Sequence, residues 1–328
     1  MLKKKAILGL IIAAFTGLQA WYLYLMLTYP FYGIITEKND RGEWVVTAFD
    51  PASNPLPIDV QIGDIITLVD GHEPGRHSTV RYGIIEQFRS LELLRNGKVI
   101  TFEVGDLPTV GYIDIQSFAG ELLPLLFALI VYLKIPDSRS ARQLSLVFLC
   151  VGVTFMGVGA NGRGDFFGKN LVVDGVFTVP ILFLHFLTVF FKEKGNFLFP
   201  AVPVKWLYLI PVSFTVLGLL TLVSPEIAEF NHNYAPALNS IPFLFSIVMN
   251  FYVLAKAYFR HRKEKSYEAT IIRTIWVSLV ISFLPFALLT VVPQMFWDDT
   301  NNYVNPLYTA WFILFFPASF AYLIASKQ

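Results

Sequence analysis

Cysteine is nearly absent from this sequence of 328 residues, in which Cys150 is the single example. One cysteine excludes an intramolecular disulfide and cannot supply a cluster of thiolate metal ligands. Cys150 also falls inside a long apolar segment, where a thiol usually packs as a small apolar side chain. We therefore expect no disulfide framework and no metal site, and no sequence motif indicates a cofactor.

Charged residues are also scarce, at 15% of the chain, and the 25 basic and 24 acidic residues nearly cancel. Nucleic acid binding requires clustered lysine and arginine on one accessible face, so this charge balance argues against a nucleic acid partner. Apolar residues make up 55% of the chain, and the mean hydropathy is +0.57. Such a composition is typical of a protein embedded in a lipid bilayer.

Eight segments are long and apolar enough for a helix to cross the hydrocarbon layer, which needs about 20 residues. They are residues 6–28, 113–133, 144–160, 171–191, 206–223, 238–258, 271–293 and 306–325. The sequence predicts a polytopic α-helical membrane protein with about eight spans. It divides into an N-terminal anchor at residues 1–28, an island at 29–112, and a seven-helix bundle at 113–328.

The first span follows a basic head that resembles a signal peptide. The apolar run continues through Trp21 and Tyr22, and no small-residue cleavage site closes it. We expect an uncleaved anchor that stays in the membrane.

Basic residues in short loops set the orientation, because lysine and arginine are retained on the cytoplasmic side. They precede span one and follow spans two, four and six: Lys3, Lys4, Lys5, Lys134, Arg139, Arg142, Lys192, Lys194, Lys205, Arg260, Arg262, Lys263 and Lys265. The pattern predicts a multi-pass protein of the plasma membrane, with both termini in the cytoplasm and residues 29–112 outside.

The island is expected to be mostly β, with one helix. Residues 33–38 and 43–49 flank a turn-forming segment, and residues 91–94 and 98–104 flank an Asn-Gly pair, so both sets predict hairpins. Residues 78–88 have apolar positions at near-helical spacing and predict one short helix.

The segment VQIGDIITLVDG, at residues 60–71, resembles the signature of PDZ domains. Gly63 and Asp64 would turn the chain into a strand, and Asp70 and Gly71 would turn it out again. PDZ domains bind an extended peptide as an added strand and hold its terminal carboxylate with backbone amides. The resemblance implies a carboxylate loop at Phe31, Tyr32, Gly33 and Ile34. Two roles are open for this segment. It can capture a peptide at the loop, or it can be a PDZ scaffold that only couples the spans.

The whole layout resembles the sensor half of ComP-type quorum-sensing histidine kinases. The resemblance rests on the span order, the PDZ-like segment and the Gly-Arg-Gly turn at residues 162–164. It implies an extracellular peptide pheromone as ligand, prenylated on tryptophan in the best-known systems. Membrane lipid, a cytoplasmic histidine kinase and response regulator pathway, and a second copy of the chain are the further partners it implies.

The printed sequence, which runs to Gln328, has no phosphoacceptor-histidine helix and no glycine-rich ATP-binding segment. The expectation is that the kinase half was removed or that it lies on a separate chain.

Polar groups at membrane depth are costly and are therefore often functional. Glu121 lies in the second predicted span, and four further polar residues lie near external span ends: Asn161, Arg163, Asp165 and Asp174. An arginine and carboxylate cluster there can either pair structurally or contact a ligand. These five residues join the carboxylate loop as candidate ligand-binding residues.

No catalytic motif is found in the sequence. HEPGR at residues 72–76 lacks the second histidine of a zinc-protease helix, and no nucleophile elbow or Walker loop occurs. We therefore expect a receptor without an active site. The alternative is a PDZ-type membrane adaptor or quality-control protein that captures protein C-termini, and a transporter is a third interpretation.

The predicted orientation has a direct test. Cysteine labelling or protease protection in intact cells should place Asp64 and its neighbours outside the membrane, because the basic loops hold the opposite side in the cytoplasm. Labelling of these positions only after the cells are permeabilised would contradict it.

Overall fold

The computed structural model describes most of the chain. The described residues are 2–50, 53, 59–76, 80, 83–103, 110–135, 137–193, 204–221, 223–261, 263, 267–291, 309, 312, 315 and 319. Two compact units are formed, one by Met1–Phe118 with Met156–Val172 and the other by Ala119–Phe155 with Val173–Gln328. The functional division at residues 28 and 112 stays a prediction.

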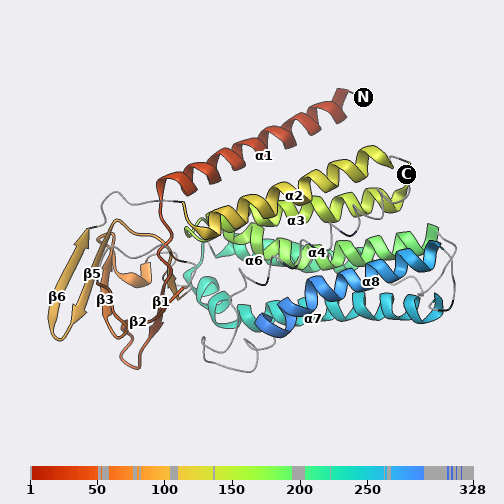
Figure 1. Ribbon diagram of the computed structural model, residues 1–328. Coiled ribbons are helices and arrows are strands. Elements are labelled where there is room, and N and C mark those ends of the chain that lie inside the picture. The colour runs from red at the N-terminus through yellow and green to blue at the C-terminus, as the bar shows by residue number, and fades with distance from the viewer. Residues whose placement is uncertain are drawn as a thin grey trace. The chain divides into compact units, whose positions relative to one another are not determined.

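The first unit contains a six-stranded sheet (Figure 1). Its strands are β1 (Ile34–Lys38), β2 (Trp44–Phe49), β3 (Ile65–Val69), β4 (Ile84–Ile85), β5 (Ser90–Arg95) and β6 (Lys98–Glu103). The order across the sheet is β4-β1-β2-β3-β5-β6, and all five pairings of neighbouring strands are antiparallel. A short 3-10 turn, Pro74–Arg76, follows β3.

Both predicted hairpins are confirmed. β1 pairs with β2, and Asn39 Oδ1 accepts hydrogen bonds from two backbone amides of the turn between them. β5 pairs with β6 around Asn96 and Gly97, which both have positive φ angles, of 52° and 77°. An Asn-Gly pair favours this backbone conformation, which matches the twist of the two strands.

The predicted helix at residues 78–88 is wrong where the structure describes it. Ile84 and Ile85 form β4 and pair with Ile35 and Ile34 of β1. Both are β-branched and fit a pleated strand, and Gly83, with φ of 74°, separates them from the preceding turn. Residues 77–79, 81 and 82 lie outside the described part of the chain.

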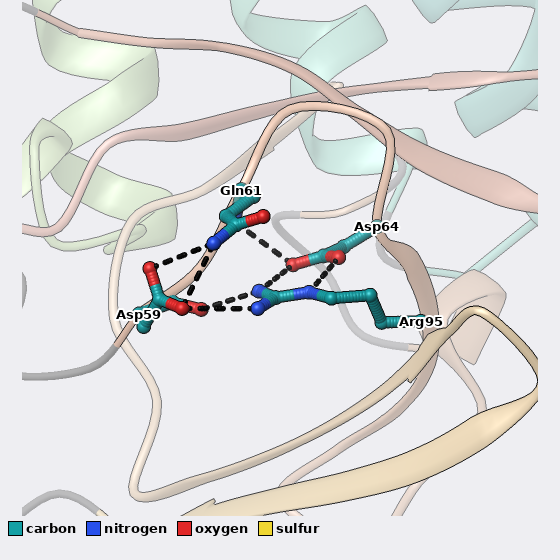
Figure 2. A network of polar contacts seen from close by, with 4 residues as sticks. All are labelled: Asp59, Gln61, Asp64 and Arg95. Atoms are coloured by element: carbon teal, nitrogen blue, oxygen red, sulfur yellow. Dashed lines mark hydrogen bonds and ion pairs between the residues drawn. The ribbon is translucent and has the colours of Figure 1, made fainter.

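A network around Asp64 joins the loop before β3 to the end of β5 (Figure 2). Arg95 Nε and Nη2 donate to the two carboxylate oxygens of Asp64, each at 2.7 Å, and Asp64 Oδ2 also accepts the Gln61 amide at 2.8 Å. Asp59 accepts from Arg95 Nη1 at 3.0 Å on the solvent side. The Gly-Asp pair of the PDZ-like segment is therefore tied to an arginine 31 residues away.

The helices are α1 (Leu2–Thr28), α2 (Tyr112–Lys134), α3 (Arg139–Asn161), α4 (Phe166–Glu193), α5 (Val204–Leu207), α6 (Leu209–Leu220), α7 (Pro225–His261) and α8 (Tyr267–Phe286). A π turn, Ala287–Val291, continues α8. Helices α2, α3, α4, α7 and α8 each contain a segment long and apolar enough to cross a membrane. These five coincide with predicted spans two, three, four, six and seven, so the protein is a multi-pass membrane protein.

The remaining three spans stay predictions. The first falls within α1, of which the side chains before residue 14 lie outside the described part. The fifth coincides with the short α5 and the 12-residue apolar helix α6. The eighth, residues 306–325, falls almost entirely on residues outside the described part.

Within the first unit, the C-terminal half of α1 packs on the end of α3. Tyr22 and Leu25 form a buried cluster with Met156 and Ala160. α3 and α4 come close together next to this cluster, because Gly168 faces Ala160: a Cβ on Gly168 would lie 2.8 Å from the Ala160 Cβ. Small residues at a helix interface allow such close backbone approach.

The second unit has its own apolar core, built from the parts of α2, α3, α4, α7 and α8 that belong to it. Leu187, Leu254 and Ile275 are fully buried in this core. α4 and α7 are also joined by Asn250, whose Nδ2 donates to the Pro180 carbonyl at 2.9 Å and to the Ser246 carbonyl at 2.9 Å.

The Asp64 network generates a stability prediction. Arg95→Gln removes charge-assisted hydrogen bonds from a buried carboxylate and should lower the local unfolding free energy by about 1.5–3 kcal/mol. Hydrogen exchange of β3 and β5 amides in the whole chain measures the change. The control is Arg41→Gln, at an exposed position of the β1–β2 turn, which should change exchange little; equal effects of both substitutions would contradict the assignment.

The same network predicts a pH dependence. The hydrogen bond from Arg95 holds the pKa of Asp64 below its ordinary value. The ionised form therefore stabilises the fold fully above the ordinary unfolded pKa of about 4, and this contribution is lost as pH falls through the lower folded pKa. Amide protection in β3 should fall on acidification below about pH 4, and Asp64→Asn should flatten that dependence.

Candidate functional site

The turn between α3 and α4 carries the Gly-Arg-Gly-Asp segment, residues 162–165. Gly164 has a φ of 75°, a conformation that glycine adopts without strain, and its amide donates to the Asn161 carbonyl at 3.0 Å. Asp165 caps α4, because its Oδ1 accepts the Gly168 amide at 2.7 Å. The turn therefore fixes the direction in which the intervening Arg163 side chain leaves the backbone.

Arg163 is fully buried, with no exposed side-chain surface. Its Nη1 and Nη2 donate to the two carboxylate oxygens of Asp114, at 2.6 Å and 2.9 Å, which makes a bidentate ion pair. Nε donates to the Tyr29 carbonyl at 2.8 Å, and Nη1 also donates to the Gly159 carbonyl at 3.0 Å. A guanidinium has five N–H donors, and a buried one is tolerated only when they are used.

We call the part of the chain that carries strands β1 to β6 the sheet domain. The contacts of Arg163 join both ends of this domain to the α3–α4 turn. Tyr29 follows α1, where the chain enters the sheet domain, and Asp114 lies in the first turn of α2, where the chain leaves it. Asp114 Oδ2 also accepts the Gly111 amide at 2.7 Å, which caps the start of α2. One arginine therefore contacts both covalent connections between the sheet domain and the helices.

Two further contacts reinforce this junction. Trp21 of α1 donates its indole N–H to Asp165 Oδ2 at 3.0 Å. Lys169, in the first turns of α4, lies with its Nζ 3.0 Å from Glu86 Oε1 in the segment after β4. Burial raises the pKa of Glu86 to about 7, although the Lys169 ammonium acts in the opposite direction.

We call the group of Trp21, Glu86, Asp114, Arg163, Asp165 and Lys169 the polar junction. It belongs entirely to the first unit. Asp114, Arg163, Glu86 and Lys169 join the sheet strands or their connections to the α3–α4 turn and to α4. Trp21 and Asp165 join α1 to the same turn.

The candidate carboxylate loop lies beside β4. Tyr32 is fully buried, its ring centroid lies 4.7 Å from that of Phe88, and its amide donates to the Glu86 carbonyl at 2.9 Å. Gly33 has a φ of 57°, and its carbonyl accepts the Asp50 amide at 2.8 Å. Ile34 pairs with β4 and Phe31 is buried, so this loop is engaged with the chain itself.

The structure brings together some of the residues expected from the sequence. Asn161, Arg163 and Asp165 share one turn in the first unit. Glu121 and Asp174 belong to the second unit, where Glu121 is half-buried in α2 and Asp174 Oδ2 accepts the Thr215 hydroxyl at 2.7 Å. The carboxylate that pairs with Arg163 is Asp114.

Sequence reasoning missed Asp114, Trp21, Glu86 and Lys169. Asp114 could have been found, since it is an acidic residue at the start of a predicted span, where a charge is costly without a partner. Glu86 and Lys169 gave no comparable signal, because both fall in segments that are polar at intervals.

Comparison with known proteins finds a similar sensor kinase. The chain is 24% identical to the sensor histidine kinase ComP of Bacillus subtilis strain 168 over a 319-residue alignment, which covers 93% of the chain. The predicted resemblance to ComP-type sensor kinases is confirmed. The chain spans about two fifths (39%) of the length of this relative. No family model and no solved structure matches the chain, so the PDZ-like identity of the sheet domain stays a prediction.

The buried ion pair leads to a mutational prediction. Arg163→Gln leaves Asp114 buried without its charge partner and should lower stability by about 3–5 kcal/mol. Protease cleavage near residues 26–29 in the purified whole chain measures the opening of the junction. Arg89→Gln, at an exposed arginine whose Nη2 lies 3.3 Å from the Tyr29 hydroxyl, is the control and should change cleavage little.

A double substitution separates charge from packing. Replacing both partners, as Arg163→Met with Asp114→Leu, should cost less than Arg163→Gln alone, because no charge is then left buried. A double variant that opens more than the single variant would contradict an electrostatic role for the pair.

Proposed function

We propose that this chain is a membrane receptor that senses an extracellular peptide pheromone and relays the signal to a cytoplasmic histidine kinase module. The observation that supports it best is the contact of Arg163 with both connections of the sheet domain. The similarity to a sensor histidine kinase favours signalling over other roles for such a junction. Under this proposal the sheet domain and its two connections lie outside the cell, and both termini lie inside.

The relay follows from how a ligand can shift an equilibrium. A ligand moves a protein toward one arrangement only if it binds that arrangement more tightly than the other. A peptide bound against the sheet domain would either strengthen the polar junction or compete with it, through contacts with the half-buried candidate residues Asn161 or Asp165. The connection from Asp114 leads directly into α2, and the turn that carries Arg163 leads into α4. Movement of the sheet domain is therefore coupled to two helices.

The adaptor alternative requires a peptide strand beside β1. That edge of β1 is occupied by β4, and the Thr36 amide donates to the Gly83 carbonyl at 2.7 Å on the same side. Strand addition beside β1 would first require the displacement of β4. No observation therefore favours the adaptor over the receptor.

Photo-cross-linking tests the proposal. The probe is a photoreactive, radiolabelled form of a secreted peptide encoded beside the gene for this chain, applied to membranes that contain the whole chain. We expect saturable labelling that the unlabelled peptide prevents. Competition should not depend on a free C-terminal carboxylate, so a C-terminally amidated peptide should compete equally.

Two results would count against the receptor. Labelling that never saturates, in membranes where the chain is folded, would contradict peptide sensing. Loss of competition on amidation, together with binding of many unrelated C-termini, would indicate the adaptor, since terminal carboxylate capture is its mode of recognition.

A further inference from the structure

The second unit has a hollow of about 650 Å³ between the start of α3 and the end of α4. It is lined by Arg139, Arg142, Gln143, Leu146, Val189, Lys192 and Glu193. On α3 these residues recur at intervals of three and four, and the same holds on α4, so each set lies on one helix face. We propose that this hollow binds the headgroup of an anionic phospholipid that carries hydroxyl donors, such as phosphatidylglycerol. The proposal does not depend on the peptide-sensing function.

The charge of the hollow favours an anion. Arg139, Arg142 and Lys192 carry three positive charges and are exposed, against one carboxylate, Glu193. None of the ion pairs formed among the described residues includes any of the three cations. The two arginines also lie in the first turns of α3, where the helix dipole is positive and disfavours cations.

The Glu193 carboxylate accepts its hydrogen bonds from groups other than the three cationic side chains. Its Oε1 accepts the Arg139 backbone amide at 2.9 Å, and its Oε2 accepts the Ser140 hydroxyl at 2.6 Å. The carboxylate thus caps the start of α3 from the end of α4 and fixes the two walls of the hollow. A phosphate would add negative charge to that of Glu193 against the three cations.

The lining also indicates a lipid rather than a free phosphate ion. Leu146 lines the hollow one turn beyond Arg142, and Leu146 and Leu149 are 44% and 42% exposed on a helix that can cross the membrane. Acyl chains below a bound headgroup would cover these side chains. Basic pockets between the ends of membrane helices are typical binding sites for anionic lipid headgroups.

Gln143 indicates which headgroup would bind. Its Oε1 is buried and accepts no hydrogen bond within the part of the chain that the structure describes. A buried amide end without a partner is costly, and a headgroup that carries both phosphate acceptors and hydroxyl donors can satisfy either orientation of the Gln143 amide. The hydroxyl groups of a phosphatidylglycerol headgroup can donate to Gln143 while the phosphate contacts the three cations.

The test uses the whole chain in phosphatidylcholine nanodiscs with increasing fractions of phosphatidylglycerol. A ligand that binds the folded state raises the melting temperature with its concentration. We expect saturable stabilisation of the natural sequence, and an apparent affinity at least about tenfold weaker for Arg139→Gln/Arg142→Gln/Lys192→Gln, since hydrogen bonds to charged groups are lost. The single variant Arg142→Gln should also weaken the apparent affinity for phosphatidylglycerol. It replaces the triple variant in the test if the triple variant does not fold.

Matched variants separate a site from general charge attraction. Lys134→Gln/Arg260→Gln/Lys263→Gln removes the same number of exposed basic residues elsewhere in the second unit and should keep the full phosphatidylglycerol effect. Gln143→Leu should reduce the preference for phosphatidylglycerol over phosphatidic acid, by about threefold.

Three outcomes would overturn the proposal. Equal weakening by both triple variants would show attraction to the membrane surface in general. Equal stabilisation by inorganic phosphate in pure phosphatidylcholine would show an anion site without a lipid. Absence of any dependence on phosphatidylglycerol would leave the hollow without this ligand.

Discussion

The packing of the α1, α2 and α3 ends in the first unit depends on the ion pair between Arg163 and Asp114. Both side chains are buried, and their attraction compensates for removal from water only because the hydrogen bonds are well aligned and the remaining donors are used. The geometry is possible because Gly164 allows the turn and because small residues let α3 and α4 approach closely. A buried pair of this kind is weak evidence for stability, and we infer that its role here is to favour one arrangement over others. That property suits a junction between a sheet domain and membrane helices.

The sheet domain is bound to its surroundings at several points beyond this pair. Glu86 contributes twice, because its carbonyl accepts the Tyr32 amide and its carboxylate pairs with Lys169. The segment after β4 therefore connects the candidate carboxylate loop with the start of α4. If a ligand displaced β4 from β1, it would also disturb the contact with Lys169. Under the proposed function, binding at the sheet edge would be coupled to rearrangement at the helices through this one short segment.

The sequence was most informative where a local pattern determines structure. Hydropathy located the spans now seen as α2, α3, α4, α7 and α8, and the Asn-Gly pair at residues 96–97 located the second hairpin. Near-helical spacing misled at Ile84 and Ile85, since the pairing with β1 that decides their conformation lies about 50 residues away. Arg163 was found as a costly charge, but its partner depends on how three helix ends pack, which no local pattern encodes. The basic residues of the α3–α4 hollow were recognised only as orientation signals, because their convergence on one hollow requires the fold.

The hydrogen bond from Asn250 to the Pro180 carbonyl has a mechanical consequence. A proline within a helix interrupts its hydrogen bonds and usually creates a point about which the two halves can flex. In α4 that point is fastened to α7 by an amide that also bonds its own helix at Ser246. Bending of α4 at Pro180 would therefore displace α7 as well. We expect the two helices to move together at this point instead of α4 flexing alone.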